Sequence, residues 1–63
     1  MVLSPDQIEM LKLGKLGKLG KVAVDYGEDD HFELLELQLG GLVDQFLGLT
    51  TKGRQMLSEV WQG

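Results

Sequence analysis

A three-residue repeat near the amino terminus constrains the fold of this chain more than any other feature. From residue 11 to residue 21 the sequence is Leu-Lys-Leu-Gly-Lys-Leu-Gly-Lys-Leu-Gly-Lys. Each glycine costs roughly 1 kcal/mol against alanine inside a helix, so tertiary contacts must hold any helix that continues through the repeat. A step of three residues also turns the side chain back by about 60° on a helix, which spreads the lysines over half the circumference. We therefore interpret the repeat either as a frayed helix end or as a tight, glycine-rich packing face.

The small size of the chain limits the core that it can build. Its 63 residues form one domain at most, residues 1–63. A domain of this size buries only about 60% of the surface that its unfolded chain exposes. The sequence has no cysteine and a single histidine, His31, which excludes disulfides and the common zinc sites. We therefore expect a homodimer or a stabilising partner, and no metal or other cofactor.

The distribution of apolar residues indicates where in the cell the protein is expected to be found. No apolar run approaches the ~20 residues that span a bilayer, and the first residues carry neither a positive charge nor an apolar run typical of a signal peptide. These patterns predict a cytoplasmic protein with no membrane partner.

Local signals predict a helix and then a short strand in the first part of the chain. Ser4 is a typical helix cap, Pro5 suits the first helical position, and the helix is expected to run to about Leu13 or on to Leu19. Residues 22–24, Val-Ala-Val, predict a strand, because they are rich in β-branched side chains and lie between a glycine and a turn.

The second half predicts a helix, a very small hairpin and a last helix. The middle helix is expected to be capped by Asp29 or Asp30 and to end at residues 40–41, Gly-Gly. Residues 42–43 and 46–47 are expected to pair as a hairpin around residues 44–45. Thr50 or Thr51 then caps the last helix, whose apolar residues share one face. They are Met56, Leu57, Val60 and Trp61, and Trp61 is expected to pack on the first helix.

The carboxyl-terminal third resembles the winged-helix family. Residues 39–43, Leu-Gly-Gly-Leu-Val, match the family's G-L-V step from the recognition helix into the wing. Residues 49–57, Leu-Thr-Thr-Lys-Gly-Arg-Gln-Met-Leu, match its L-T-x-x-G-R-x-x-L step from the wing into the last helix, and residues 3–7 look like the start of its first helix. The resemblance implies a mainly α domain with a small β-hairpin, an α+β class, in a winged-helix-like three-helix architecture. It also implies a DNA-binding transcriptional regulator.

The chain departs from this family at the residues that would contact DNA. The recognition helix would correspond to residues 30–39, and the wing to residues 44–48, and neither contains lysine or arginine. Base reading in the major groove relies on Arg, Lys, Asn and Gln, and phosphate contacts need cations. Only Gln38 remains, so DNA binding through the usual face is disfavoured.

The acidic residues predict a different surface. Residues 25–49 contain seven acidic residues and no basic residue. Acids at helical spacings of three and four repel one another, so folding alone would gain from replacing some of them. We therefore predict a partner-binding stripe that recognises a basic protein surface, although the favourable interaction of acids with a helix amino terminus is the simpler interpretation. The predicted partner-binding residues are Asp29, Asp30, Glu33 and Glu36.

The basic residues form the alternative candidate site. They would bind phosphate if they gathered on one face, and an ordinary solvated surface is the simpler interpretation. The residues are Lys12, Lys15, Lys18, Lys21, Lys52 and Arg54.

The middle helix has an apolar arc that is wider than one packed face needs. Phe32, Leu35 and Leu39 lie on one side, and Leu34 and Leu37 lie beyond it. The arc indicates either simple core filling or burial of one part against a second subunit or a partner.

The other constellations carry no recognisable chemistry. A calcium loop counted from Asp25 has Gly27 and Asp30 where a ligand and the invariant glycine are needed. The G-x-x-G segment at residues 14–17 lacks room before it for the strand and helix of a KH domain. His31 has no partner nucleophile in a known motif, so we expect no enzyme.

The sequence as a whole favours a small acidic regulator or inhibitor that docks on a basic partner. Small acidic proteins of viruses and mobile elements, phage-like proteins among them, often block nucleic-acid-binding machinery in this way, which is an argument by analogy alone. The alternative is the winged-helix DNA-binding regulator.

Overall fold

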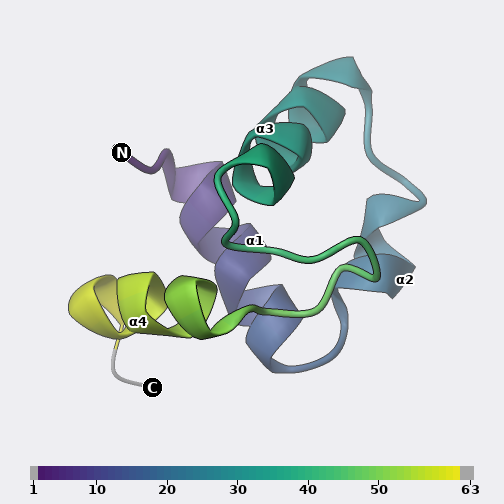
Figure 1. Cartoon of the computed structure of the whole chain (residues 1–63). Coiled ribbons are helices and arrows are strands. Elements are labelled where there is room, and N and C mark those ends of the chain that lie inside the picture. Colours follow the sequence, from purple (N-terminus) through teal and green to yellow (C-terminus); the bar gives the residue numbers. More distant parts are fainter. Residues whose placement is uncertain (1, 62–63) are drawn as a thin grey trace.

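The computed structural model describes residues 2–61, which form four helices (Figure 1). These are α1 (Pro5–Lys15), α2 (Leu19–Ala23), α3 (Glu28–Leu39) and α4 (Thr51–Val60). Each of the other three helices contacts α1, which therefore forms the centre of the packing. None of the described helices has the length and apolar character that crossing a membrane requires.

The first helix begins and ends where local signals place it. The Ser4 hydroxyl accepts the N–H of Gln7 at 3.1 Å, and the Gln7 side chain accepts the N–H of Ser4 at 3.1 Å, which completes a capping box. At the other end Gly17 has a φ of 73°. The N–H groups of Gly17 and of the next residue donate to the carbonyls of Gly14 and Leu13, as in a Schellman motif. The repeat is therefore a helix end, formed by its second glycine.

The strand predicted over residues 22–24 is wrong, because most of that segment belongs to the short helix α2. Leu19 and Ala23 are both buried, and Lys21 between them is exposed. On a helix, residues 19 and 23 share one face and residue 21 lies on the other, as observed. A strand would place all three side chains on the same face. Val24 remains 80% exposed, so the β propensity of its side chain has no sheet to join.

The predicted hairpin around residues 44–45 is also wrong, and the described part of the chain contains no strand. Only an isolated antiparallel bridge joins Val43 to Leu49 in this region. The bridge therefore pairs Val43 with a residue beyond the predicted second strand, residues 46–47, and Phe46 is 83% exposed. The domain is all-helical, and the α+β class and the winged-helix-like three-helix architecture with a hairpin are corrected accordingly.

A tight turn replaces the hairpin for a local reason. The Asp44 carboxylate accepts the N–H groups of Phe46 at 2.8 Å and of Gly48 at 2.9 Å. These donors are therefore satisfied inside the turn and cannot extend a ladder. Leu47, with a φ of 64°, completes the reversal of the chain.

The third helix begins slightly earlier than expected and ends as expected. Gly27 occupies the cap position without a side-chain hydrogen bond, so Asp29 and Asp30 lie in the first turn and do not cap it. Gly41 has a φ of 78°, and the N–H of Leu42 returns to the carbonyl of Leu37 at 2.9 Å. The Gly-Gly stop is therefore confirmed as a second Schellman motif.

The last helix packs closely against the loop that precedes it. The Thr50 hydroxyl accepts the N–H of Gly53 at 3.0 Å, which confirms Thr50 as the cap. A Cβ at Gly53 would collide with the carbonyl oxygen of Leu42, so glycine is needed for this approach. The core contains apolar side chains from every helix and from the loop before α4. They are Met10, Leu11, Leu19, Ala23, Leu34, Leu37, Leu42, Val43 and Leu57.

Trp61 lies directly after α4 and contacts the first helix, as predicted. The ammonium groups of Lys12 and Lys15 lie 5.2 and 5.4 Å from its ring centroid, within the range of cation–π attraction. The ring is partly buried against the core, while Val60 on the expected inner face is 54% exposed.

Candidate functional site

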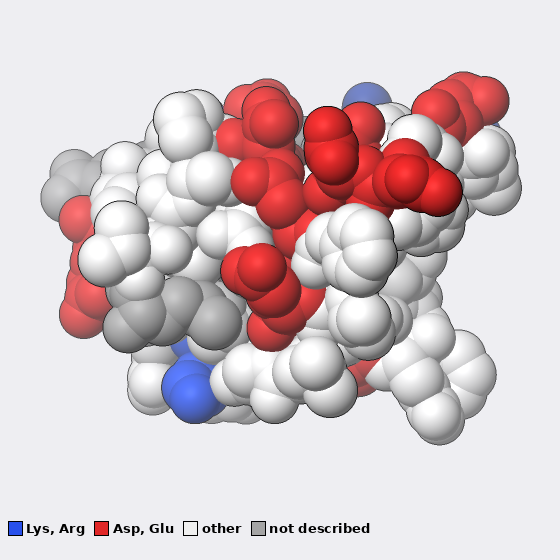
Figure 2. All heavy atoms as spheres, turned by 90° about the horizontal axis from the view of Figure 1, so that it is seen from above, with Lys and Arg blue, Asp and Glu red and all other residues white. Residues whose placement is uncertain are grey.

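The predicted acidic stripe lies on α3. Asp29 and Glu36 are exposed, and Asp30 and Glu33 are half-buried. Figure 2 views the side of the molecule where α3 lies uppermost in Figure 1, and it shows acidic side chains spread across this face with basic atoms only at its margins. The four predicted residues therefore all lie on α3, although they differ in their surroundings.

Two of these acids also hold α3 against α1. The Glu33 carboxylate accepts the Ser4 hydroxyl at 2.8 Å. The Gln7 amide, which is buried, donates to the backbone carbonyl of Glu33 at 3.2 Å and to the carboxylate of Glu36 at 3.1 Å. Reversing the charge of either acid would therefore weaken the fold as well as any docking surface. Sequence reasoning missed this contact, because a glutamine in an amphipathic helix gives no sign that it is buried.

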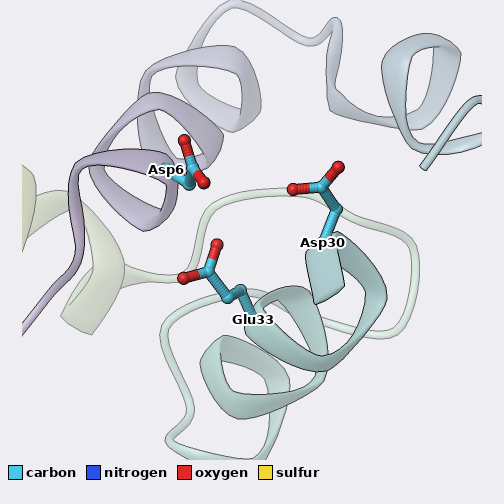
Figure 3. A group of neighbouring side chains, drawn as sticks. All are labelled: Asp6, Asp30 and Glu33. Carbon is cyan, nitrogen blue, oxygen red and sulfur yellow. The ribbon is translucent and has the colours of Figure 1, made fainter. Parts of the chain in front are cut away.

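Asp6 joins two of the stripe residues in a carboxylate cluster (Figure 3). Oxygen atoms of Asp6, Asp30 and Glu33 all lie within 4.8 Å of one another, and the three side chains point toward a common space between α1 and α3. Carboxylate oxygens suit hard cations. The Ser4 hydroxyl already donates to Glu33, however, and exposed acidic groups of this kind are common without an ion, so we assign no metal here.

Tyr26 follows α2 and lies close enough to this carboxylate cluster for its pKa to be affected. Partial burial raises the pKa of its hydroxyl, and the nearby carboxylates of Asp30 and Asp6 raise it further. Its ring meets that of His31 edge to face, with centroids 6.3 Å apart. Tyr26 therefore stays neutral over the ordinary pH range and serves as a packing residue between α2 and α3.

An apolar stripe lies beside the acids on the outward side of α3. Phe32, Leu35 and Leu39 are 64%, 46% and 80% exposed, whereas Leu34 and Leu37 are buried. The wide apolar arc of this helix is therefore divided into a core face and an exposed face. A shallow hollow of about 340 Å³ runs along the exposed face. Its lining residues are Glu28, His31, Phe32, Leu34, Leu35 and Gln38.

The basic residues are dispersed over three helices, and several have partners inside the fold. The Lys52 ammonium donates to the carbonyl of Gly40 at 3.0 Å, where a cation stabilises the carboxyl end of α3. Lys12 and Lys15 lie over the Trp61 ring. The other predicted phosphate-binding residues are exposed on α2, beside it and on α4, and they are Lys18, Lys21 and Arg54.

The fold and this surface define a small all-helical domain with an acidic face bordering an exposed apolar stripe. Comparisons with known protein families, with curated proteins and with solved structures find no match for the chain.

Proposed function

We propose that the protein is a small regulatory or inhibitory interaction module that docks the acidic face of α3 on a basic protein surface. The observation that carries the proposal is the concentration of charge: residues 25–49 contain seven acidic residues and no basic residue, and five of the acids lie on α3, on the side where Figure 2 shows acidic side chains across the surface. Such a field increases association rates with basic partners and repels nucleic acid.

The simpler explanations account for only part of this charge. The amino terminus of α3 favours Glu28, Asp29 and Asp30 in its first turn, and this effect fades beyond that turn. Glu33 and Glu36 receive hydrogen bonds from α1, but a neutral glutamine could accept the same bonds. The negative charge at these two positions is therefore not required by the fold.

The DNA-binding alternative lacks a specific observation in its favour. The turn at residues 44–48 is held by Asp44 and contains no lysine or arginine. Helix α3 contains none either. Cations outside this region would have to supply the phosphate contacts, and Lys52 is engaged at the end of α3.

The test uses conservative neutral variants, so that the fold is kept. Asp29→Asn with Glu36→Gln removes two charges from the stripe, and the new amide oxygen at position 36 can still accept the Gln7 hydrogen bond. The matched control, Glu9→Gln with Glu59→Gln, removes two charges from exposed positions on α1 and α4. Each purified protein is immobilised and used to capture binding proteins from an extract of the source cells.

The wild type and the control are expected to retain a basic protein that high salt releases. The stripe variant should bind that protein at least about fivefold more weakly, which corresponds to about 1 kcal/mol. Equal retention by all three proteins would show that the acids are an ordinary solvated surface, provided that circular dichroism confirms equal folding.

A further inference from the structure

The outward side of α3 combines two features that a docking surface needs. Phe32, Leu35 and Leu39 follow spacings of three and four, so they form one apolar stripe along the helix. At about 100° per residue, Asp29 and Glu36 lie only about 40–60° around the helix from Phe32. The apolar stripe therefore has an acidic border on the side that faces α1.

The opposite border is polar and contains no lysine or arginine. Glu28, His31 and Gln38 line the hollow on that side, together with Leu35. The Gln38 amide donates to the carbonyl of Asp44 at 3.3 Å, which places the turn at residues 44–48 next to this border. The surface is thus an apolar groove with acidic side chains near both edges and no basic residue among residues 25–49.

We propose that this surface binds a cationic amphipathic helix from a partner protein. Apolar side chains at positions i, i+3 or i+4, and i+7 of that helix would pack on Phe32, Leu35 and Leu39 and fill the hollow. Lysine or arginine side chains on one flank would meet Asp29 and Glu36. The inference rests on the proposed function and identifies the partner class for the same surface.

Charge complementarity distinguishes this occupant from a second copy of the chain. A copy that paired through its own α3 would bring another acidic helix, because residues 25–49 contain no basic residue. The acidic border would then gain no opposite charge. A cationic helix supplies both the apolar side chains and the missing positive charge.

The experiment measures binding of two synthetic peptides to the full-length protein. The first has about 18 residues, or five helical turns, with leucines along one side of the helix and lysines elsewhere. The second has the same composition in a scrambled order without helical periodicity. Fluorescence anisotropy at ~0.15 M salt, near physiological ionic strength, gives the Kd of each peptide.

Variants separate the apolar contribution from the acidic one. Phe32→Gln with Leu35→Gln removes the exposed apolar side chains, and Leu16→Gln with Val60→Gln is the control for exposed apolar residues on other elements. The helical peptide should bind the wild type and this control at least about tenfold more tightly than it binds the Phe32 and Leu35 variant. It should also bind at least about tenfold more tightly than the scrambled peptide.

Three results would overturn the inference. The first is equal binding of the two peptides, the second is unchanged binding to the Phe32 and Leu35 variant, and the third is a dimer of the protein alone that this variant abolishes in sedimentation. None of these would refute the proposed function, which fails only if Asp29→Asn with Glu36→Gln leaves capture of a basic partner unchanged. The two failures are therefore distinguishable.

Discussion

At the residue scale, Gly53 allows α4 to approach the backbone of the preceding loop because glycine has no side chain. It lies in the first turn of α4 and is buried against the backbone at Leu42. The methyl group of Leu49 would also lie within 2.9 Å of an added Cβ. The Leu42 carbonyl accepts the N–H of Thr50 at 3.1 Å and cannot move without breaking that bond. The close approach therefore depends on glycine at this position.

We expect Gly53→Ala to destabilise the domain by about 3 kcal/mol, because overpacking against backbone cannot be relieved by a change of rotamer. This is most of what a core of this size supplies. Urea denaturation followed by circular dichroism measures the change in the free energy of unfolding.

Gly20→Ala is the matched control for this substitution. Gly20 also lies in a helix, but nothing surrounds its added Cβ within 4 Å. Alanine there should stabilise the domain by about 0.5–1 kcal/mol, because it is the better helix former. A stable Gly53→Ala variant would mean that α4 lies farther from Leu42 than the structure shows.

At the element scale, the contact between α1 and α3 depends on polar groups as well as on the apolar core. Gln7 is the buried polar residue at this contact, and its amide joins the cap of α1 to the middle of α3. Its carbonyl accepts the N–H of Ser4, and its NH₂ group donates to Glu33 and Glu36. One side chain therefore satisfies a helix cap and aligns two helices.

Gln7→Ala should lower the free energy of unfolding by about 1–3 kcal/mol, the usual cost of removing a buried hydrogen-bonding partner. Gln55→Ala, at an exposed position on α4, should change it by less than about 0.5 kcal/mol. Thermal and urea unfolding of the two variants measure both quantities. Similar stability of the two variants would contradict the bridging role of Gln7.

At the scale of the whole molecule, the net charge of −4 is less informative than its distribution. Five of the ten acidic residues lie on α3, and the basic residues lie outside residues 25–49. Of these, Lys12, Lys15 and Lys52 contact groups of the fold itself. No wing is present among residues 2–61 to reach the backbone of a duplex. Both facts argue against phosphate binding.

We therefore expect no sub-micromolar binding to duplex DNA at ~0.15 M salt, near physiological ionic strength. An anisotropy titration with labelled duplexes of mixed sequence checks this expectation. Lowering the salt should reveal only weak binding with a small salt dependence, because few phosphates could be neutralised. Tight duplex binding that Lys18→Ala with Lys21→Ala abolishes would favour the DNA-binding alternative.

The sequence by itself determined the starts of α1 and α4 and the end of α3. Ser4, Thr50 and the glycines at positions 17 and 41 act through hydrogen bonds with residues three to five positions away, and such signals are legible without the fold. The acidic stripe was equally legible, because its residues are neighbours on one helix. The winged-helix resemblance also rests on local motifs. The hairpin that it implies is absent from residues 2–61, and the resemblance itself remains a prediction.

Only the tertiary structure decided the features that depend on distant residues. Residues 19–23 are helical because Leu19 and Ala23 reach a core that α1 and α3 build. Tertiary packing also buried Gln7 and left Phe32 exposed, although each lies on an amphipathic helix. Local propensities differ by at most about 1 kcal/mol for such residues, so contacts between segments far apart in the chain outweigh them.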